Sequence, residues 1–585
     1  MMTKRALAPR LSKIDKAVEL FASEFPMYVV AILASLFILL IAATVFWSTF
    51  VPGLPRFSAH LSLSNYGEAL GDPLTAKAGL NSLWLSLGTV AINLFFALPL
   101  GWLIHRTDVP WKAFFTALVY LTLMIPGFLN GIAWIILLSP KIGIINQLLK
   151  TVGLNALNIY GITGMAFVQG LVLTPPMFFM ISPALLAFDS SLEEAAEVSG
   201  LNKMKVLLHV SVPLLLPVLL AAVIYNFMTA MAMFEIPALL GLPARIYVLS
   251  TLMFTTVHST FGLPNYGLAG VDGLLLVIPM LVALMFYQRL LKSSYRYVVV
   301  SGRGYRPKQI ELGSWKWVGV GFILLYFLLA LFLPLLTLIW TSITPFIAIP
   351  SRETIALWNF QGYRQAVSAL TQWDLLFNTG MLVFTVALGV LLISVAVSWI
   401  VLRSRLPGKY VIDTVSMLPH GIPTIAISFA IGFVAVAVSR WIPIHGSLAT
   451  IMLAHIVAYV SFGTRNIQGG LIQIHRELDE AGRVCGLSIM SIFRRITLPL
   501  LAPALFYGGL WVALLSYREV TMALFLQGPR NNVLTTTIWQ FWANSNTATT
   551  SALGLILFAT VGIGVGALLR ISSVFFYSPQ RNPKR

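Results

Sequence analysis

The sequence predicts an all-α, polytopic membrane protein with about twelve transmembrane helices in two parallel, pseudo-twofold-related six-helix halves. Three observations predict it: the composition, the number of long apolar segments, and a duplicated motif. Of the 585 residues, 58% are hydrophobic and only 10% are charged, and the mean hydropathy is +0.87. A soluble globule of this length needs far more polar surface. The chain must therefore have lipid as its solvent.

Apolar segments long enough to cross a bilayer recur along the whole chain. A helix needs about 20 apolar residues to span the hydrocarbon core. Twelve segments satisfy this requirement, and they lie near residues 27–49, 80–104, 113–138, 160–186, 213–240, 268–288, 317–342, 378–402, 411–439, 447–466, 499–525 and 551–576. An even number of spans per half gives the two halves the same orientation in the membrane.

Charge predicts how these spans are oriented. With both termini in the cytoplasm, 28 of the 38 lysines and arginines fall on the cytoplasmic side, as the positive-inside rule requires. The net charge of +18 is therefore mostly a signature of membrane topology. It does not indicate nucleic-acid binding, because the basic residues are spread over many loops instead of one face.

A short motif occurs twice, 286 positions apart, in loops predicted to be cytoplasmic. Its two copies comprise Glu194, Ala195, Ala196, Gly200 and Pro213, and then Glu480, Ala481, Gly482, Gly486 and Pro499. Glycine enters the left-handed conformation at little cost. Each copy of the motif therefore predicts a short helix that ends at the motif glycine. Proline is tolerated in a first helical turn, so each proline predicts the start of the next span.

Two further capping residues complete this local prediction. Asn202 and Ser488 each lie two positions after the motif glycine, and both residue types favour the N-cap of a second short helix. Each loop therefore reads as a helix, a turn and a second helix.

Earlier positions in the two halves also correspond, with an offset of 297. The matching pairs are Asn81 and Asn378, Arg106 and Arg403, Pro110 and Pro407, Lys112 and Lys409, and Pro126 and Pro423. Parallel repeats of this kind argue against an inverted-repeat secondary transporter and predict a pore between the halves. Pro126, Pro423, Pro175 and Pro176 are expected to break or kink helices near the midplane.

The duplicated motif resembles the EAA loop of binding-protein-dependent ABC importer permeases, whose consensus is E-A-A, three residues, G, nine residues, I-x-L-P. Only Gly482, where the family usually has alanine, departs from it. The resemblance implies that each loop docks on a cytoplasmic ATPase. It also implies partners: two copies of that ATPase, and a periplasmic or lipid-tethered solute-binding protein outside the membrane.

The predicted organisation has five parts. They are a cytoplasmic arm (1–26), a first permease domain (27–290) with its EAA-like loop at 190–213, a basic linker (291–316), a second permease domain (317–577) with its loop at 475–499, and a cytoplasmic tail (578–585). The linker stretch 295–307 resembles the joint in fused permeases of the ferric-iron importer type. As an alternative, it is an ordinary basic interhelical loop.

The sequence predicts no chemistry of the chain's own. No G-x-x-x-x-G-K-[ST] phosphate loop occurs, so ATP is expected to be used by a partner subunit and no cofactor is expected on this chain. The eight histidines show no H-x-x-x-H spacing, and no G-x-S-x-G or C-x-x-C motif occurs. We therefore predict a transport component, with no enzyme activity and no firm metal site.

Charged residues inside apolar segments indicate the pathway. Glu235 and Glu519 occupy equivalent places about 20 residues after Pro213 and Pro499, near the external end of the fifth helix of each half. Ionisable groups there are costly unless they face water or a partner, so both are candidates for a cation pathway. Alternatively, Glu519 pairs with Arg518 or caps a helix. Further polar residues near or within spans are interpreted as hydrogen-bonded structural groups: Asp272, Asp413, His420 and His455.

Together these features predict a multi-pass permease of the bacterial inner membrane that forms the channel of an ABC importer. Ferric iron is the preferred substrate, and thiamine, polyamines, phosphonates or sugar phosphates are alternatives. An ion-coupled secondary transporter is a remote alternative, which would work without an ATPase. A structural scaffold would leave the duplicated loops without a purpose.

Overall fold

The structure is a computed structural model that describes residues 8–55, 60–186, 196, 198–200, 202–206, 209, 212–258, 263–294, 310–404 and 408–576. Within these ranges the chain forms helices and no β-strand, apart from one isolated bridge between Thr107 and Ile310. The predicted all-α membrane fold is confirmed. Most of the linker, the C-terminal tail and two motif residues, Glu194 and Ala195, lie outside the described residues.

The first half contains long helices separated by short ones. In chain order they are α1 (Ala8–Ser48), α2 (Ser64–Gly71), α3 (Pro73–Arg106), α4 (Lys112–Met124), α5 (Gly127–Leu138), α6 (Ile144–Thr151), α7 (Ile162–Leu186), α9 (Lys203–Val206), α10 (Val212–Ala232), η2 (Pro237–Gly241), η3 (Leu242–Ala244), α11 (Leu249–Val257) and α12 (Tyr266–Ser294).

The second half repeats this pattern. Its elements are η5 (Gly313–Trp315), α13 (Lys316–Phe327), η6 (Leu328–Phe332), α14 (Leu333–Ile343), α15 (Arg352–Ala356), α16 (Gln361–Leu370), α17 (Trp373–Arg403), α18 (Lys409–Met417), η7 (Leu418–Gly421), α19 (Thr424–Val438), α20 (Leu448–Ile472), α21 (Arg476–Val484), α22 (Ile489–Ile492), η8 (Phe493–Thr497), α23 (Leu498–Arg518), α24 (Thr521–Phe525), α25 (Leu534–Ala543) and α26 (Thr547–Phe576).

Ten helices in the described ranges are long and apolar enough to cross a membrane, and up to thirteen spans result if each bent helix pair counts as one. Two of the twelve predicted spans are bent pairs. The segment 113–138 bends by 91° between α4 and α5, and 411–439 bends by 105° between η7 and α19. The breaks fall at Pro126 and Pro423, as predicted, because proline lacks the N–H that a continuous helix needs.

Other helix boundaries differ from the prediction. Pro175 and Pro176 do not break a helix, since both lie inside α7, and the kink expected there stays a prediction. The predicted span 213–240 ends earlier, at Ala232, and the chain then turns into a third bent pair of short helices, Pro237–Ala244 and Leu249–Val257, with an angle of 76°. The second half likewise continues from α23 into the short helices α24 and α25.

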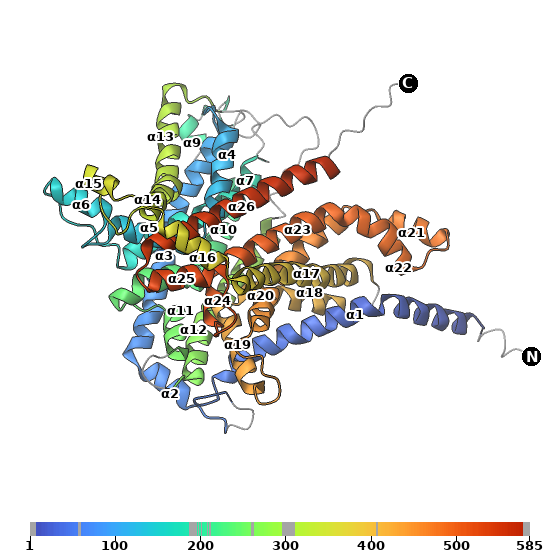
Figure 1. Cartoon of the computed structure of the whole chain (residues 1–585). Coiled ribbons are helices and arrows are strands. Elements are labelled where there is room, and N and C mark those ends of the chain that lie inside the picture. The colour runs from blue at the N-terminus through green and yellow to red at the C-terminus, as the bar shows by residue number, and fades with distance from the viewer. Residues whose placement is uncertain are drawn as a thin grey trace, which may run out of the picture.

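The two halves exchange their first long helices. Helix α1 packs against α17, α18 and α19 of the second half, and Figure 1 shows it running beside them toward the N-terminus. The Tyr28 hydroxyl on α1 hydrogen-bonds the hydroxyl of Ser404, which follows α17. In return, α14 of the second half packs against α5 of the first as well as against α26 of its own half. Each half therefore contacts the first long helix of the other.

The hydrophobic cores are also shared. The largest cluster joins Leu129 and Ile132 on α5 with Leu553 and Leu557 on α26. A second cluster joins residues such as Phe234, from the first half, with residues on α19 and α24. Because apolar packing crosses between the halves at both places, the two repeats form one continuous helical body.

Small residues allow the helices to approach closely. At Gly463 on α20, an added Cβ would lie 2.5 Å from both Val390 Cγ1 and Ser394 Oγ on α17. Helix pairs in membranes depend on such close contacts because lipid supplies no hydrophobic drive for them to associate. Gly469 is six residues further along the same helix, is exposed, and has open space around its Cα.

These two glycines provide a matched test of the helix packing. We expect Gly463→Ala to lower the free energy of unfolding by about 1–3 kcal/mol, because the added methyl group overpacks the contact between α17 and α20. The control Gly469→Ala should leave stability unchanged or raise it by up to about 1 kcal/mol, because alanine favours helix. Thermal unfolding of the purified protein in detergent measures both, and equal midpoints for the two variants would contradict this packing.

Candidate translocation pathway and coupling loops

The helix breaks expose backbone N–H groups, and a carboxylate accepts from one of them in the first half. Glu235 lies three residues beyond the end of α10, just outside the helix in which it was expected. Its Oε2 accepts a hydrogen bond of 3.1 Å from the backbone N–H of Phe128, in the first turn of α5. An added Cβ at Gly127 would fall 2.3 Å from Glu235 Oε1, so only glycine permits this close approach.

Glu519 plays a corresponding part in the second half. It is the residue that ends α23, and its carboxylate accepts hydrogen bonds from the backbone N–H groups of Met522 at 2.9 Å and Ala523 at 3.4 Å. The carboxylate therefore caps the short helix α24, where negative charge suits the helix N-terminus. The geometry thus supports the helix-capping role considered for Glu519 from sequence, and its place in a cation pathway stays a prediction.

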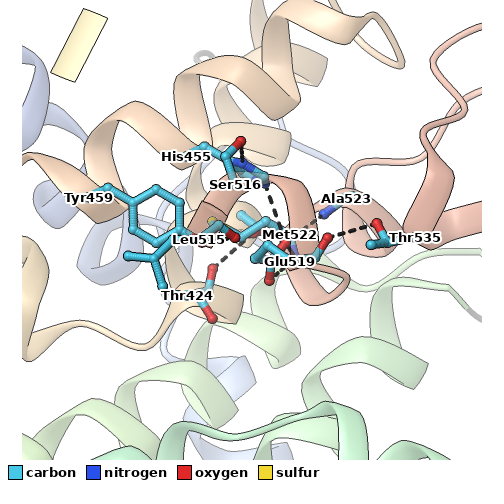
Figure 2. Close-up of polar contacts among 10 residues, drawn as sticks. Thr424, His455, Tyr459, Leu515, Ser516, Glu519, Met522, Ala523 and Thr535 are labelled. Carbon is cyan, nitrogen blue, oxygen red and sulfur yellow. Dashed lines mark hydrogen bonds and ion pairs between the residues drawn. The ribbon is translucent and has the colours of Figure 1, made fainter. Parts of the chain in front are cut away.

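A buried histidine contacts the same carboxylate. His455 Nε2 on α20 lies 3.3 Å from Glu519 Oε2, and the two side chains are 0% and 11% exposed. The distance is that of an ion pair, but Nε2 makes no hydrogen bond of good geometry. The other ring nitrogen, Nδ1, hydrogen-bonds Ser516 Oγ at 2.8 Å. Figure 2 shows these groups gathered around Glu519.

Arg518 joins the two halves electrostatically. Its guanidinium donates to the backbone carbonyl of Leu123, in the first half, and it interacts with the charge of Glu235 and with Tyr459. Glu235 in turn interacts with Glu519. We call Glu235, His455, Tyr459, Arg518 and Glu519 the central polar cluster. It lies where the bent helix pairs of the two halves meet.

The other polar residues noted in the sequence have different surroundings. Asp413 accepts from Gln468 Nε2 at 2.8 Å and pairs with Arg465 at 3.6 Å, so a structural role is confirmed for it. His420 stacks on Tyr225. Asp272 is 1% exposed, and neither carboxylate oxygen has a hydrogen-bond partner among the described residues. The expectation of a satisfied hydrogen bond is therefore wrong for Asp272.

The second EAA-like loop has the predicted helix-turn-helix form. Gly486 follows α21 with φ of +78°, a value that favours glycine because other residues meet a steric penalty there. The Ser488 side chain accepts from Ser491 N and caps α22. Gly482 is buried, and an added Cβ would lie 2.9 Å from Ile492 Cγ1, which explains glycine in place of alanine. Glu480 and Ala481 are exposed.

The described part of the first loop agrees with the second. Ala196 is helical, and Gly200 has φ of +89°. Asn202 Oδ1 accepts from Lys205 N at 2.9 Å, as a capping residue does. Pro213 and Pro499 lie in the first turn of α10 and α23, where their missing N–H carries no cost.

An ion pair fixes the second loop to the membrane helices. Arg403, the last residue of α17, lies 3.3 Å from Asp479 on α21, and the two side chains are 6% and 10% exposed. Arg403 also donates to the carbonyl of Ile474 at 2.6 Å, and Asp479 accepts from Thr497 at 3.4 Å. The ion pair therefore holds α21 against the end of α17.

Known proteins support the same assignment. The family described as the binding-protein-dependent transport system inner membrane component matches residues 97–297 and 402–575, one copy of the motif in each segment. The chain belongs to this family. The resemblance inferred from the two loops is thereby confirmed, and this inner-membrane component is part of a transport system.

Curated relatives of this family member include ferric transport permeases. It is 26% identical over 445 residues to the ferric transport system permease protein FbpB of Actinobacillus pleuropneumoniae. It is 25% and 21% identical to two FbpB proteins of Haemophilus influenzae, over 438 and 516 residues. The alignments cover 74%, 73% and 86% of this chain, and 62%, 66% and 92% of the relatives.

Sequence reasoning singled out the two glutamates but missed most of their partners. The repeat offset of 286 pairs His455 with Gln169, whose Nε2 donates to the Ala230 carbonyl at 2.7 Å. His455 contacts Ser516, which is the counterpart of Ala230. Both halves thus have a polar side chain at this position that contacts the fifth helix. A comparison of the halves position by position would therefore have indicated His455 as a partner of the fifth helix. Arg403 carried a signal too, since Arg106 is its counterpart.

Loss of the Arg403–Asp479 pair should loosen the second loop. In Asp479→Asn the Arg403 charge stays buried without a counter-charge, which typically costs about 3–5 kcal/mol. We expect faster amide hydrogen exchange over residues 476–484, measured by mass spectrometry on the purified protein. Glu477→Gln, an exposed charge removal in the same helix, is the control. Unchanged exchange in Asp479→Asn would show that the pair does not hold the loop.

Proposed function

We propose that this chain is the fused permease subunit of an ABC importer, with both permease domains in one polypeptide. The observation that carries the proposal is the pair of EAA-like loops, with left-handed Gly200 and Gly486 at matching places. The second loop turns Asp479 and Gly482 inward and leaves Glu480 and Ala481 exposed. Exposed motif residues on a firmly anchored short helix suit docking of a partner protein.

The partners follow from the same proposal. Two cytoplasmic ATPase subunits bind the two loops and use ATP, and a periplasmic or lipid-tethered binding protein delivers the solute outside. Both termini lie in the cytoplasm, in agreement with the excess of basic residues assigned to that side. Closure of the ATPase pair moves α21 and, through the Arg403–Asp479 pair, α17. The pore then opens alternately to the outside and to the cytoplasm.

Ferric iron is the proposed substrate. Three relatives that carry ferric transport in their names support this choice, and so does the presence of two carboxylates where the halves meet. Hard cations favour oxygen ligands. Among the described residues, no three His, Cys, Asp or Glu side chains converge as a metal site. We therefore assign Glu235 and Glu519 to attraction of a passing cation, which must bind weakly enough to leave.

The central polar cluster suits a closed state of this pathway. Arg518 interacts with Glu235 and bonds the Leu123 carbonyl across the two halves, while Glu519 is held by His455 and the N-terminus of α24. Opening the pathway requires Arg518 to release the Leu123 carbonyl and move away from Glu235. Separation of the halves would do so and would leave negative charge facing the passage.

Uptake of radiolabelled Fe³⁺ by proteoliposomes tests the proposed substrate. It also distinguishes loss of coupling to the ATPase from loss of ion passage through the pore. The vesicles contain the chain with its ATPase and binding protein. We expect Glu480→Ala to abolish both ATPase binding and uptake. Glu519→Gln should lower uptake by at least about tenfold and keep ATPase binding, since the glutamine oxygen still caps α24 while the charge is lost.

The control is Glu353→Gln, an exposed glutamate on α15, which should transport normally. No iron uptake by the intact complex would overturn the substrate and direct the search to thiamine, polyamines, phosphonates and sugar phosphates. Iron uptake that persists without the ATPase would overturn the importer assignment in favour of an ion-coupled transporter.

A second test addresses the loop itself. Gly486→Val places a β-branched residue at φ of +78°, which costs at least about 1–2 kcal/mol and displaces α22. Cys485→Val adds the same side chain one residue earlier, where φ is an ordinary −75°. We expect ATP-driven uptake to fall about tenfold or more in Gly486→Val alone, with normal membrane insertion in both. Equal uptake in the two variants would contradict the coupling role.

A further inference from the structure

A polar cavity of about 350 Å³ lies behind the second coupling loop. The end of α17 and the start of α18 contribute Trp399, Arg403 and Lys409 to its wall, and α21 contributes Arg476 and Arg483. The cavity therefore lies between the membrane helices on one side and the loop helices on the other. We call it the loop cavity.

Positive charge in the loop cavity is only partly neutralised. Four cationic side chains line it, with two carboxylates, Asp479 and Glu480. Asp479 pairs with Arg403, but the buried Nε of Arg403 has no hydrogen-bond partner among the described residues. The guanidinium of Arg476 lies close enough to repel that of Arg403. An anion in the cavity would relieve this repulsion.

The remaining cations have donors to spare. Lys409 Nζ donates to the Ser404 carbonyl at 3.2 Å, and Arg476 donates to the Leu402 carbonyl. Within the described part of the chain, Lys409, Arg476 and Arg483 have no carboxylate within ion-pair distance. Guanidinium and ammonium groups arranged around one space suit the several oxygens of a phosphate group.

The depth of the cavity indicates where the phosphate comes from. The predicted apolar spans 378–402 and 27–49 reach their cytoplasmic ends here, next to Arg403 and close to Tyr28. Tyr28 of α1 bonds Ser404, another residue of the cavity wall. Two spans therefore cross the edge of the hydrocarbon at this level, and Trp399 has the residue type favoured there. Phospholipid phosphates lie at the same depth.

The first half contains only part of this arrangement. The membrane-helix residues Trp399, Arg403 and Lys409 correspond to Trp102, Arg106 and Lys112 with the offset of 297. The loop residues Arg476 and Arg483 correspond, with the offset of 286, to Ser190 and Glu197. The basic loop side of the cavity is thus specific to the second half, and general helix packing does not require it.

We propose that the loop cavity binds the phosphate group of an anionic phospholipid from the cytoplasmic leaflet. The phosphate contacts Arg476 and Arg483 from the loop and Lys409 from the membrane side. Basic recesses between membrane helices on this side of the bilayer suit such headgroups. The bound lipid braces α21 against α17 and makes the position of the second coupling loop depend on lipid composition.

Native mass spectrometry of the purified full chain tests this proposal without its ATPase or any substrate. The protein is prepared with an equal mixture of phosphatidylglycerol and phosphatidylcholine, and the lipids that remain bound are counted. We expect wild type to retain phosphatidylglycerol about tenfold over phosphatidylcholine. The double variant Arg476→Gln/Arg483→Gln and the single variant Lys409→Gln should each lose most of this preference.

Arg494→Gln/Arg495→Gln is the matched control, because it removes the same charge from exposed positions on η8 that do not line the cavity. It should keep the wild-type preference. The proposal is overturned if the cavity variants retain phosphatidylglycerol as well as the control does. It is also overturned if millimolar inorganic phosphate displaces the bound phosphatidylglycerol from wild type, which would assign the cavity to a soluble phosphate.

Discussion

The central part of this structure depends on satisfying backbone N–H groups where helices break inside the membrane. Lipid offers no hydrogen bonds, so each break must find its partners within the protein. Proline interrupts two spans at Pro126 and Pro423, and the fifth helix of each half ends early. Glu235 accepts from the first turn of α5, and Glu519 accepts from the first turn of α24. The same carboxylates that permit the breaks thereby bring ionisable groups to the contact between the halves.

The two carboxylates thus both accept backbone hydrogen bonds and carry charge. This explains why the residues of the central polar cluster interact with one another. A carboxylate used only for capping would need no charged neighbour, whereas one buried in apolar surroundings requires compensation. Arg518 supplies it across the two halves, and His455 Nε2 lies 3.3 Å from Glu519 Oε2. Structural support and charge compensation therefore rest on one group of residues. A movement that separates the halves must change both together.

The sequence predicted the features that depend on local rules. Gly200, Gly486, Ser488 and the two motif prolines take their expected places because helix ends obey short-range steric and hydrogen-bond rules. The early ends at Ala232 and Arg518 were not predicted, since apolar residues continue beyond both and hydropathy alone does not mark a turn. The Arg403–Asp479 and Glu519–His455 contacts were missed because they join helices that are distant in sequence. No periodicity within either segment encodes such a pairing.

The exchange of first helices has a consequence for biosynthesis. Helix α1 is made first, but its main neighbours α17 and α19 begin only at Trp373 and Thr424. Helix α1 can meet α12 of its own half during translation, but its surface for α17 and α19 must face lipid until the second half is made. Its own hydrophobicity has to keep it in place, and its mean hydropathy of 2.9 is the highest of the ten straight spans described. Fusion of the halves in one polypeptide keeps the late partner tethered to α1, so that final assembly does not depend on the encounter of two separate chains.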